Sequence, residues 1–457
     1  MAAAASDKAR FYMEQSVPEL QEYERKKIFT RDEIMSIARK RSEFEHIINM
    51  PGQSSPSDYA RYAQYEMNLD TLRKKRSKRT GVKATTFTGQ KKIFNILERG
   101  VRKFQGDMGL WMQYLEYCKK EAANKKLAKA LTQCLRLHPV KWELWAWSAK
   151  FYNEEQGDMQ AARSYMQRGL RFCKRERKLW LEYARLEMLY VAKIAARRKI
   201  LGLDLERNSK QIDSTENPDA DLIALPDVTA AEIQPESNAR QAVDEGALQK
   251  LASSPALNGD IPIVIFDTAM REFDNDLLLA ERFFDMFADF DNVPCSNKIL
   301  HHVIANVSET QHINNSISVC YCNARMELLG TQGKDVVQSA DFPLKLGRAL
   351  TVLKKGFGEA PQAGADLAEK AVILLLPYLR WQERLDEDIL TVLNASVTRY
   401  LRVLTASSTK IGSGSDRVQK ITKRLLAENK TQETEALLEL ANSSSAENSG
   451  ALQLIAT

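Results

Sequence analysis

Three tryptophans recur at a regular interval and constrain the fold more than any other feature of the chain. They are 34 and 35 residues apart, and each lies 11 residues after a small residue; the pairs are Gly100 and Trp111, Cys134 and Trp145, Gly169 and Trp180. A period of this length predicts helical hairpins with a polar turn between the two helices. Since one hairpin cannot bury both of its faces, neighbours must stack. We therefore predict an all-α fold, a helical-hairpin solenoid.

An aromatic residue at the same point in every hairpin is expected to be a packing residue. An earlier, tyrosine-rich copy of the hairpin follows the same rule, because Glu66 follows Tyr59 by seven residues, as Glu187 follows Trp180. The predicted packing anchors of the repeats are Tyr59, Gly100, Trp111, Trp145, Gly169 and Trp180. The off-register Trp142 and Trp147 are instead candidates for contact with a partner.

Composition shifts along the chain predict five segments. These are an N-terminal helical segment (1–55), hairpin repeats (56–202) with a basic insertion (73–83), an acidic linker (203–260), a C-terminal helical array (261–441) and a flexible tail (442–457). The linker has 12 acidic and 4 basic residues, so we expect it to be partly disordered. In the C-terminal array Ala269 takes the place of Gly100, and phenylalanines at 283, 284 and 287 supply the aromatic bulk.

The net charge of +6 conceals opposite charges on the two halves of the chain. Residues 1–200 contain 42 Lys and Arg against 23 Asp and Glu, whereas acidic residues are in excess in 201–457. A positive field over the first half predicts an anionic partner. The alternative is a set of solvated helix faces that happen to carry lysine.

Two clusters of basic residues are the candidate binding sites. The first is the run RKKRSKR with a lysine beyond it, predicted to be a loop: Arg73, Lys74, Lys75, Arg76, Lys78, Arg79 and Lys83. A nuclear import receptor and an RNA backbone both suit it, and an idle solvated loop is the alternative. The second precedes Trp180: Lys174, Arg175, Arg177 and Lys178. Loops on one edge of a solenoid lie on the same side, so the clusters are predicted to form a stripe.

Motifs for catalysis are missing from the sequence. It contains no GxxxxGK[ST], GxGxxG or GxSxG, so we expect no enzyme, no cofactor and no small-molecule substrate. The C-x-C pair Cys320 and Cys322 with upstream histidines is too weak a pattern to predict a metal site. Six cysteines without paired spacing favour reduced thiols, and the longest apolar run (371–379) is too short to span a membrane.

Particular stretches also resemble a known family. Hairpins of this period with a W-x₂-Y element resemble half-a-TPR (HAT) repeats. The stretches FYMEQSVPELQEYERKKIFT and SDYARYAQYEMNLDTLRKKRSKR are similar to the U3 small nucleolar RNA-associated protein 6 family. The resemblance covers roughly residues 8–200 and weakens toward the C-terminus.

The resemblance implies a non-catalytic scaffold subunit of the nucleolar small-subunit processome, the 90S pre-ribosome, acting in U3-dependent pre-rRNA processing and 18S rRNA maturation. It implies WD-repeat β-propeller subunits, the U3 small nucleolar RNA and the 5′ external transcribed spacer of pre-rRNA as partners. Two alternatives stay open. One is a half-a-TPR RNA-binding module of another nuclear complex, for pre-mRNA splicing or 3′ end processing, and the other is a cytosolic helical adaptor.

Overall fold

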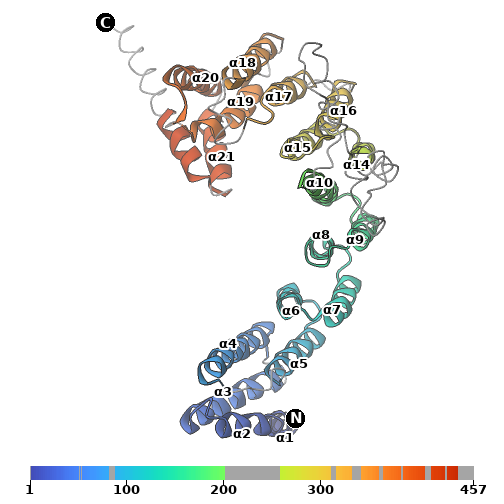
Figure 1. Ribbon diagram of the computed structural model, residues 1–457, viewed down its shortest axis with the longest axis vertical. Coiled ribbons are helices and arrows are strands. Elements are labelled where there is room, and N and C mark those ends of the chain that lie inside the picture. The colour runs from blue at the N-terminus through green and yellow to red at the C-terminus, as the bar shows by residue number, and fades with distance from the viewer. Residues whose placement is uncertain are drawn as a thin grey trace, which may run out of the picture. The chain divides into compact units, whose positions relative to one another are not determined.

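The protein is helical in every part that the structure describes. The computed structural model describes residues 2–50, 52, 54–81, 88–200, 258–309, 315–331, 341–359, 364–381, 384–406, 413–427 and 430–440. No strand occurs within these ranges, and the predicted all-α class is confirmed (Figure 1). The chain divides into two compact units, Met1–Ser148 and Ala149–Thr457. The five predicted segments are a different division and stay a prediction.

The first unit consists of helices packed in chain order. They are α1 (Ala2–Glu14), α2 (Val17–Arg25), α3 (Arg31–Asn49), α4 (Pro56–Thr80), α5 (Thr88–Lys103), α6 (Met108–Lys120), α7 (Asn124–Leu137) and the start of α8 (Trp142–Phe151). Helix α4 packs against both α5 and α6, and α6 packs against α7. A capping box begins α3, because the Thr30 side chain accepts from the Glu33 amide and the Glu33 carboxylate accepts from the Thr30 amide.

The second unit continues the pattern. Its elements are η1 (Tyr152–Gln156), α9 (Met159–Phe172), α10 (Arg177–Ile200), α14 (Asp260–Glu272), α15 (Leu277–Ala288), α16 (Ser296–Glu309), α17 (Asn315–Glu327), α18 (Asp341–Glu359), α19 (Gly364–Leu379), α20 (Glu387–Ala406), α21 (Ser413–Ala427) and the helical residues 431–440. Helix α10 packs directly on α14 and α15, so the hairpins before and after the predicted acidic linker are neighbours (Figure 1). Most of that linker lies outside the described residues, as does the tail.

The three periodic tryptophans have equivalent surroundings. Each indole Nε1 donates a 2.9 Å hydrogen bond to the backbone carbonyl six residues before it; the acceptors are Gln105, Pro139 and Lys174. Trp111, Trp145 and Trp180 are 2%, 5% and 6% exposed. Each indole therefore joins the first turns of the second helix to the loop that ends the first helix. The rings are buried, as their predicted packing role requires.

The small residues of the repeat lie at equivalent points as well. The carbonyls of Gly100, Cys134, Gly169 and Ala269 each accept a hydrogen bond, of 2.8–3.0 Å, from the amide four residues later, where the first helix ends. The predicted equivalence of Ala269 and Gly100 is thus visible in the backbone. Phe283, Phe284 and Phe287 are fully buried in α15, where they replace the missing tryptophan.

Gly100 is small because a neighbouring hairpin approaches it closely. A Cβ at this position would lie 2.8 Å from Leu110 Cδ2 and 3.1 Å from Tyr59 Cδ1. Tyr59 is the aromatic anchor of the preceding hairpin and is 3% exposed. At this point of the array the anchor of one hairpin therefore packs on the small residue of the next, which gives a physical reason for the two kinds of residue to repeat together.

We expect Trp180→Ala to lower the free energy of unfolding by roughly 3–5 kcal/mol, because it removes a buried ring as well as its hydrogen bond. Trp180→Phe keeps most of the apolar bulk and should lose less. Denaturant unfolding followed by circular dichroism measures both. Val140→Ala, at a position 73% exposed, is the control and should change little. Unaltered stability of Trp180→Ala would contradict this placement of the ring.

Candidate functional site

The first basic cluster is helical. Residues 73–80 form the last turns of α4, so the prediction that this run is a loop was wrong. The expectation rested on mutual repulsion of the cations. In the folded protein, carboxylates from the same and neighbouring helices neutralise several of them, and repulsion no longer opposes a helix. Lys83 lies outside the described residues.

Two members of this cluster are held by Asp70, one turn earlier on α4. Arg73 is 2% exposed, and its Nε and Nη2 donate to Asp70 Oδ1 at 3.0 and 2.6 Å. Lys74 Nζ lies 2.9 Å from Asp70 Oδ2 and 3.7 Å from a carboxylate oxygen of Glu121, the residue that follows α6. Arg73 is thus a core residue and not a surface charge.

Arg76 connects α4 to the start of α3. Its two terminal nitrogens donate to both carboxylate oxygens of Glu33 at 2.7 and 2.8 Å, and Nη1 also donates to the Ile28 carbonyl. The guanidinium lies over the Phe29 ring at 4.8 Å. The hydrogen bonds from Arg76 and from the Thr30 amide lower the pKa of Glu33 to about 2. Arg76 therefore stabilises the N-terminal helices.

Three cations of the cluster are left facing solvent: Lys75, Lys78 and Arg79. None of them has an ion-pair partner among the residues that the structure describes. Lys75 and Lys78 line a small groove of about 260 Å³, and Lys120 of α6 lines its opposite side. We define Lys75, Lys78, Arg79 and Lys120 as the α4–α6 basic patch. Its three α4 residues are the part of the first cluster that is available to an anion.

Neighbouring carboxylates partly neutralise the second cluster. Lys174 lies 2.5 Å from Glu272, Arg177 lies 2.7 Å from Asp276, and both acids flank the turn between α14 and α15. Arg175 is exposed beside them. The cluster therefore also contributes to packing between successive hairpins of the second unit. The first cluster belongs to the other unit, so the stripe joining the two stays a prediction.

Sequence reasoning missed two buried ion pairs that occupy the same place in two hairpins. In the α3–α4 hairpin Arg41 donates to both oxygens of Glu66 at 2.7 and 2.8 Å; in the α9–α10 hairpin Arg163 donates to both oxygens of Glu187 at 2.7 Å. Arg41, Glu66 and Glu187 are each at most 2% exposed. The shared seven-residue offset from the aromatic anchor was the available signal, and it located the acids but not their partners.

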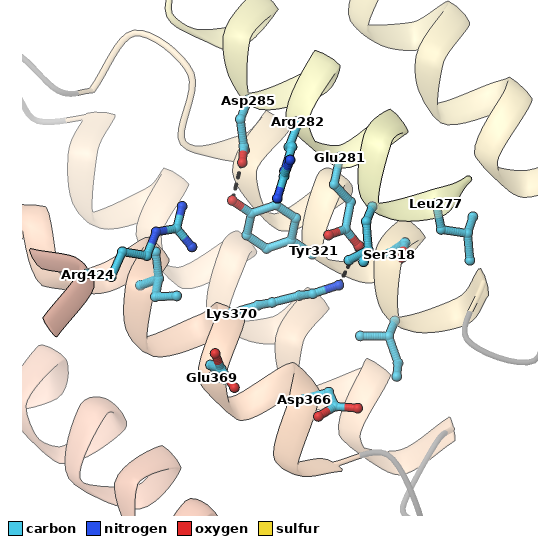
Figure 2. A pocket seen from close by; sticks show the side chains of 13 residues that line it. Leu277, Glu281, Arg282, Asp285, Ser318, Tyr321, Asp366, Glu369, Lys370 and Arg424 are labelled. Atoms are coloured by element: carbon cyan, nitrogen blue, oxygen red, sulfur yellow. Dashed lines mark hydrogen bonds and ion pairs between the residues drawn. The ribbon is translucent and has the colours of Figure 1, made fainter. Parts of the chain in front are cut away.

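A groove of about 470 Å³ lies among α15, α17, α19 and α21 (Figure 2). Figure 2 shows Lys370 reaching toward Glu281, with which it pairs, and the Tyr321 hydroxyl donating to Asp285 at 2.8 Å. Burial raises the pKa of Asp285, and the nearby Arg325 opposes that shift. Two carboxylates of the groove, Glu281 and Asp285, are thus engaged by side chains from neighbouring helices, which is typical of structural packing.

The cysteines and histidines do not assemble a metal site in the described ranges. No group of three or more His, Cys, Asp or Glu side chains there could hold a metal ion. Cys320 and Cys322 are buried, and His302 binds Asp267 at 2.8 Å; His312 is outside the described residues. All six cysteines are buried and outside disulfide bonds, and burial raises the pKa of Cys134 to about 12.

A separate feature concerns membranes. Among the described helices, none combines the length and the apolar character that a bilayer-spanning helix requires.

Stacked hairpins joined through aromatic anchors, with charges and shallow grooves on their surfaces, define a TPR-like helical-repeat protein. The family model for "U3 small nucleolar RNA-associated protein 6" matches residues 13–99, which include the α3–α4 hairpin and its Arg41–Glu66 pair. Residues 13–99 of this chain are therefore similar to that family.

Named relatives agree with the family match. The U3 small nucleolar RNA-associated protein 6 of Schizosaccharomyces pombe is 35% identical over 237 residues, which are 50% of this chain and 48% of that protein. The human homolog is 31% identical over 211 residues, 45% of this chain and 34% of the human protein. The Dictyostelium discoideum homolog is 23% identical over 360 residues, 76% of this chain and 58% of that protein. The chain thus spans about half the length of these relatives.

The Glu33–Arg76 contact should make stability depend on acidity. Because the pKa of Glu33 is about 2 in the folded protein and about 4.5 without its partners, its contribution is complete above pH 4.5 and is lost as the pH falls toward 2. Glu33→Gln should therefore have a shallower fall of melting temperature over that range. Glu43→Gln, which removes an exposed carboxylate from the same helix, is the control and should keep the wild-type slope. Equal slopes for Glu33→Gln and wild type would refute this contact.

Arg41 and Glu66 should be strongly coupled. Removing one partner leaves a buried charge unpaired, so Arg41→Met and Glu66→Leu should each cost about 3–5 kcal/mol of unfolding free energy. The double variant should lose less than the sum of the two, because the two charges that face each other are removed together and only the more distant Glu19, 3.5 Å from Arg41, loses a partner. Urea unfolding of the four proteins gives the coupling energy. Losses that simply add would show that the pair does not interact.

Proposed function

We propose that this protein is a non-catalytic scaffold subunit of the nucleolar small-subunit processome and acts in U3-dependent pre-rRNA processing. The proposal depends chiefly on the match of residues 13–99 to the family, which is supported by relatives whose names state association with the U3 small nucleolar RNA. A role in ribosome biogenesis follows from that association. The nucleus and nucleolus are the corresponding location.

The fold supports a scaffold role. Stacked hairpins offer long helix faces and grooves to other macromolecules. Several charged groups of the described helices pair with one another between different helices, which contributes to a fixed arrangement of these faces. We propose that the helix faces hold WD-repeat β-propeller subunits, and that RNA contact is secondary.

The α4–α6 basic patch is the proposed RNA contact. Its four cations are on helices α4 and α6. Cationic side chains of this kind bind phosphates without distinguishing one base from another. The U3 RNA and the 5′ external transcribed spacer are the proposed strands. The part of the first basic cluster that is paired internally, Arg73 and Arg76, contributes to folding and not to this contact.

A second candidate is a half-a-TPR module whose primary task is RNA binding in another nuclear complex, for splicing or 3′ end processing. The positive excess in residues 1–200 favours it. The acidic excess in the rest of the chain opposes it, because that half would repel a polyanion.

Charge reversal of exposed residues separates the two candidates. The test variant carries Lys75→Glu, Lys78→Glu and Arg79→Glu together. If the protein is a scaffold, this variant still co-purifies with β-propeller partners and the U3 particle. For RNA binding by the isolated chain, the slope of log affinity against log salt concentration should become shallower by about 2. The matched control reverses three exposed cations elsewhere, Lys125, Lys141 and Arg171. Loss of particle association in the first variant alone would favour the RNA module. U3 particles that lack the wild-type protein altogether would refute the processome proposal and favour the module of another complex.

A further inference from the structure

The first unit contains a second basic site that sequence reasoning did not single out. A groove of about 500 Å³ lies between α5 and α7, the first helices of two successive hairpins, with Trp111 and Tyr114 of α6 at its floor. We call it the α5–α7 groove. Its cations are Arg102 on α5 and Lys126, Lys129 and Arg136 on α7.

The groove is electropositive because its single acid is already engaged. Glu98 accepts a hydrogen bond from the Tyr114 hydroxyl at 3.2 Å and one from Lys126 at 3.1 Å, while Arg102 lies 4.0 Å from it. Lys129 and Arg136 are exposed, and neither has an ion-pair partner within the described ranges. Two cations are thus fully available, and a third, Arg102, has a side chain 79% exposed.

The spacing of these cations suits an extended peptide. Lys126, Lys129 and Arg136 recur on one face of α7 over about 15 Å at the rise of an α-helix. Alternate side chains of an extended chain are about 7 Å apart and point the same way. A segment of roughly five residues with carboxylates at alternate positions therefore matches the length of this row. Gln105 and Gln133 add amides that can bond a peptide backbone.

The floor of the groove favours peptide over RNA. Leu137 lines the groove and is 44% exposed, which provides a contact for an apolar side chain. Single-stranded RNA usually gains affinity by stacking bases on aromatic faces. Trp111 and Tyr114 are only 2% and 5% exposed, so neither ring offers a face for stacking.

We propose that the α5–α7 groove binds an extended acidic peptide segment of a partner protein, with carboxylates at alternate positions and an apolar residue against Leu137. This inference rests on the proposed scaffold role for its biological setting. It names a chemical class of partner for a site that is separate from the α4–α6 basic patch.

Peptide binding by the isolated full-length chain tests the proposal. The probe is a fluorescent ten-residue peptide with glutamates at alternate positions and one central leucine, and it should bind saturably with 1:1 stoichiometry. The same peptide with glutamines in place of glutamates should bind at least about tenfold more weakly, as expected if a few exposed ion pairs are lost. Equal binding of the two peptides would overturn the proposal.

Two variants localise the site. Lys129→Glu, Arg136→Glu should weaken binding of the acidic peptide about tenfold. The matched control Lys125→Glu, Lys141→Glu makes the same charge change at exposed positions outside the groove and should stay within twofold of wild type. Circular dichroism checks that both variants fold; if the groove variant does not, Leu137→Ser takes its place and should also weaken binding. Equal losses in the groove variant and the control would overturn the proposal.

A ten-nucleotide uridine strand separates the two classes of partner. If the groove variant loses the oligonucleotide and keeps the peptide, the groove is an RNA site and the proposal is wrong. The scaffold function is tested separately, by whether the variant Lys75→Glu, Lys78→Glu, Arg79→Glu still associates with the U3 particle. Failure of the peptide proposal is therefore distinguishable from failure of the scaffold function.

Discussion

The hydrogen bond from each periodic indole to the carbonyl six residues earlier is the interaction on which the array depends. It joins the second helix of a hairpin to the end of the first, so it helps to hold the angle at which the two helices meet. The anchor Tyr59 also packs against the next hairpin, where it meets Gly100. Geometry within one hairpin and stacking between hairpins thus depend on the same residue. A stack built this way has no single central core and presents helix faces along its length.

Positive charge in the first unit serves two different purposes. Arg41 and Arg73 are paired with carboxylates inside the fold, where an unpaired charge would be costly, and the partly exposed Arg76 is paired with Glu33. Lys75, Lys78 and Arg79 on α4, and Lys129 and Arg136 on α7, face solvent. Arginine predominates among the paired residues, because its planar group bonds both oxygens of a carboxylate. The net charge of a segment therefore overstates the charge that a partner meets.

These two exposed sets suit different partners. The α4–α6 basic patch is an open row of cations without an exposed aromatic ring, which fits contact with a phosphate backbone. The α5–α7 groove combines cations with an exposed leucine and covered aromatic rings, which fits an acidic peptide. A scaffold that contacts both RNA and protein needs such separation, because one site serving both would let them compete.

The sequence by itself determined the repeat, the all-α class and the equivalence of Ala269 with Gly100, because periodic spacing reflects local helix geometry. It also located Glu66 and Glu187 through their offset from the anchors. Only the tertiary structure decided which cations are buried. Arg41 and Glu66 are 25 residues apart in the chain, and Arg76 and Glu33 are 43 apart. Such pairs form where separate helices meet, and a linear charge pattern contains no record of which faces meet.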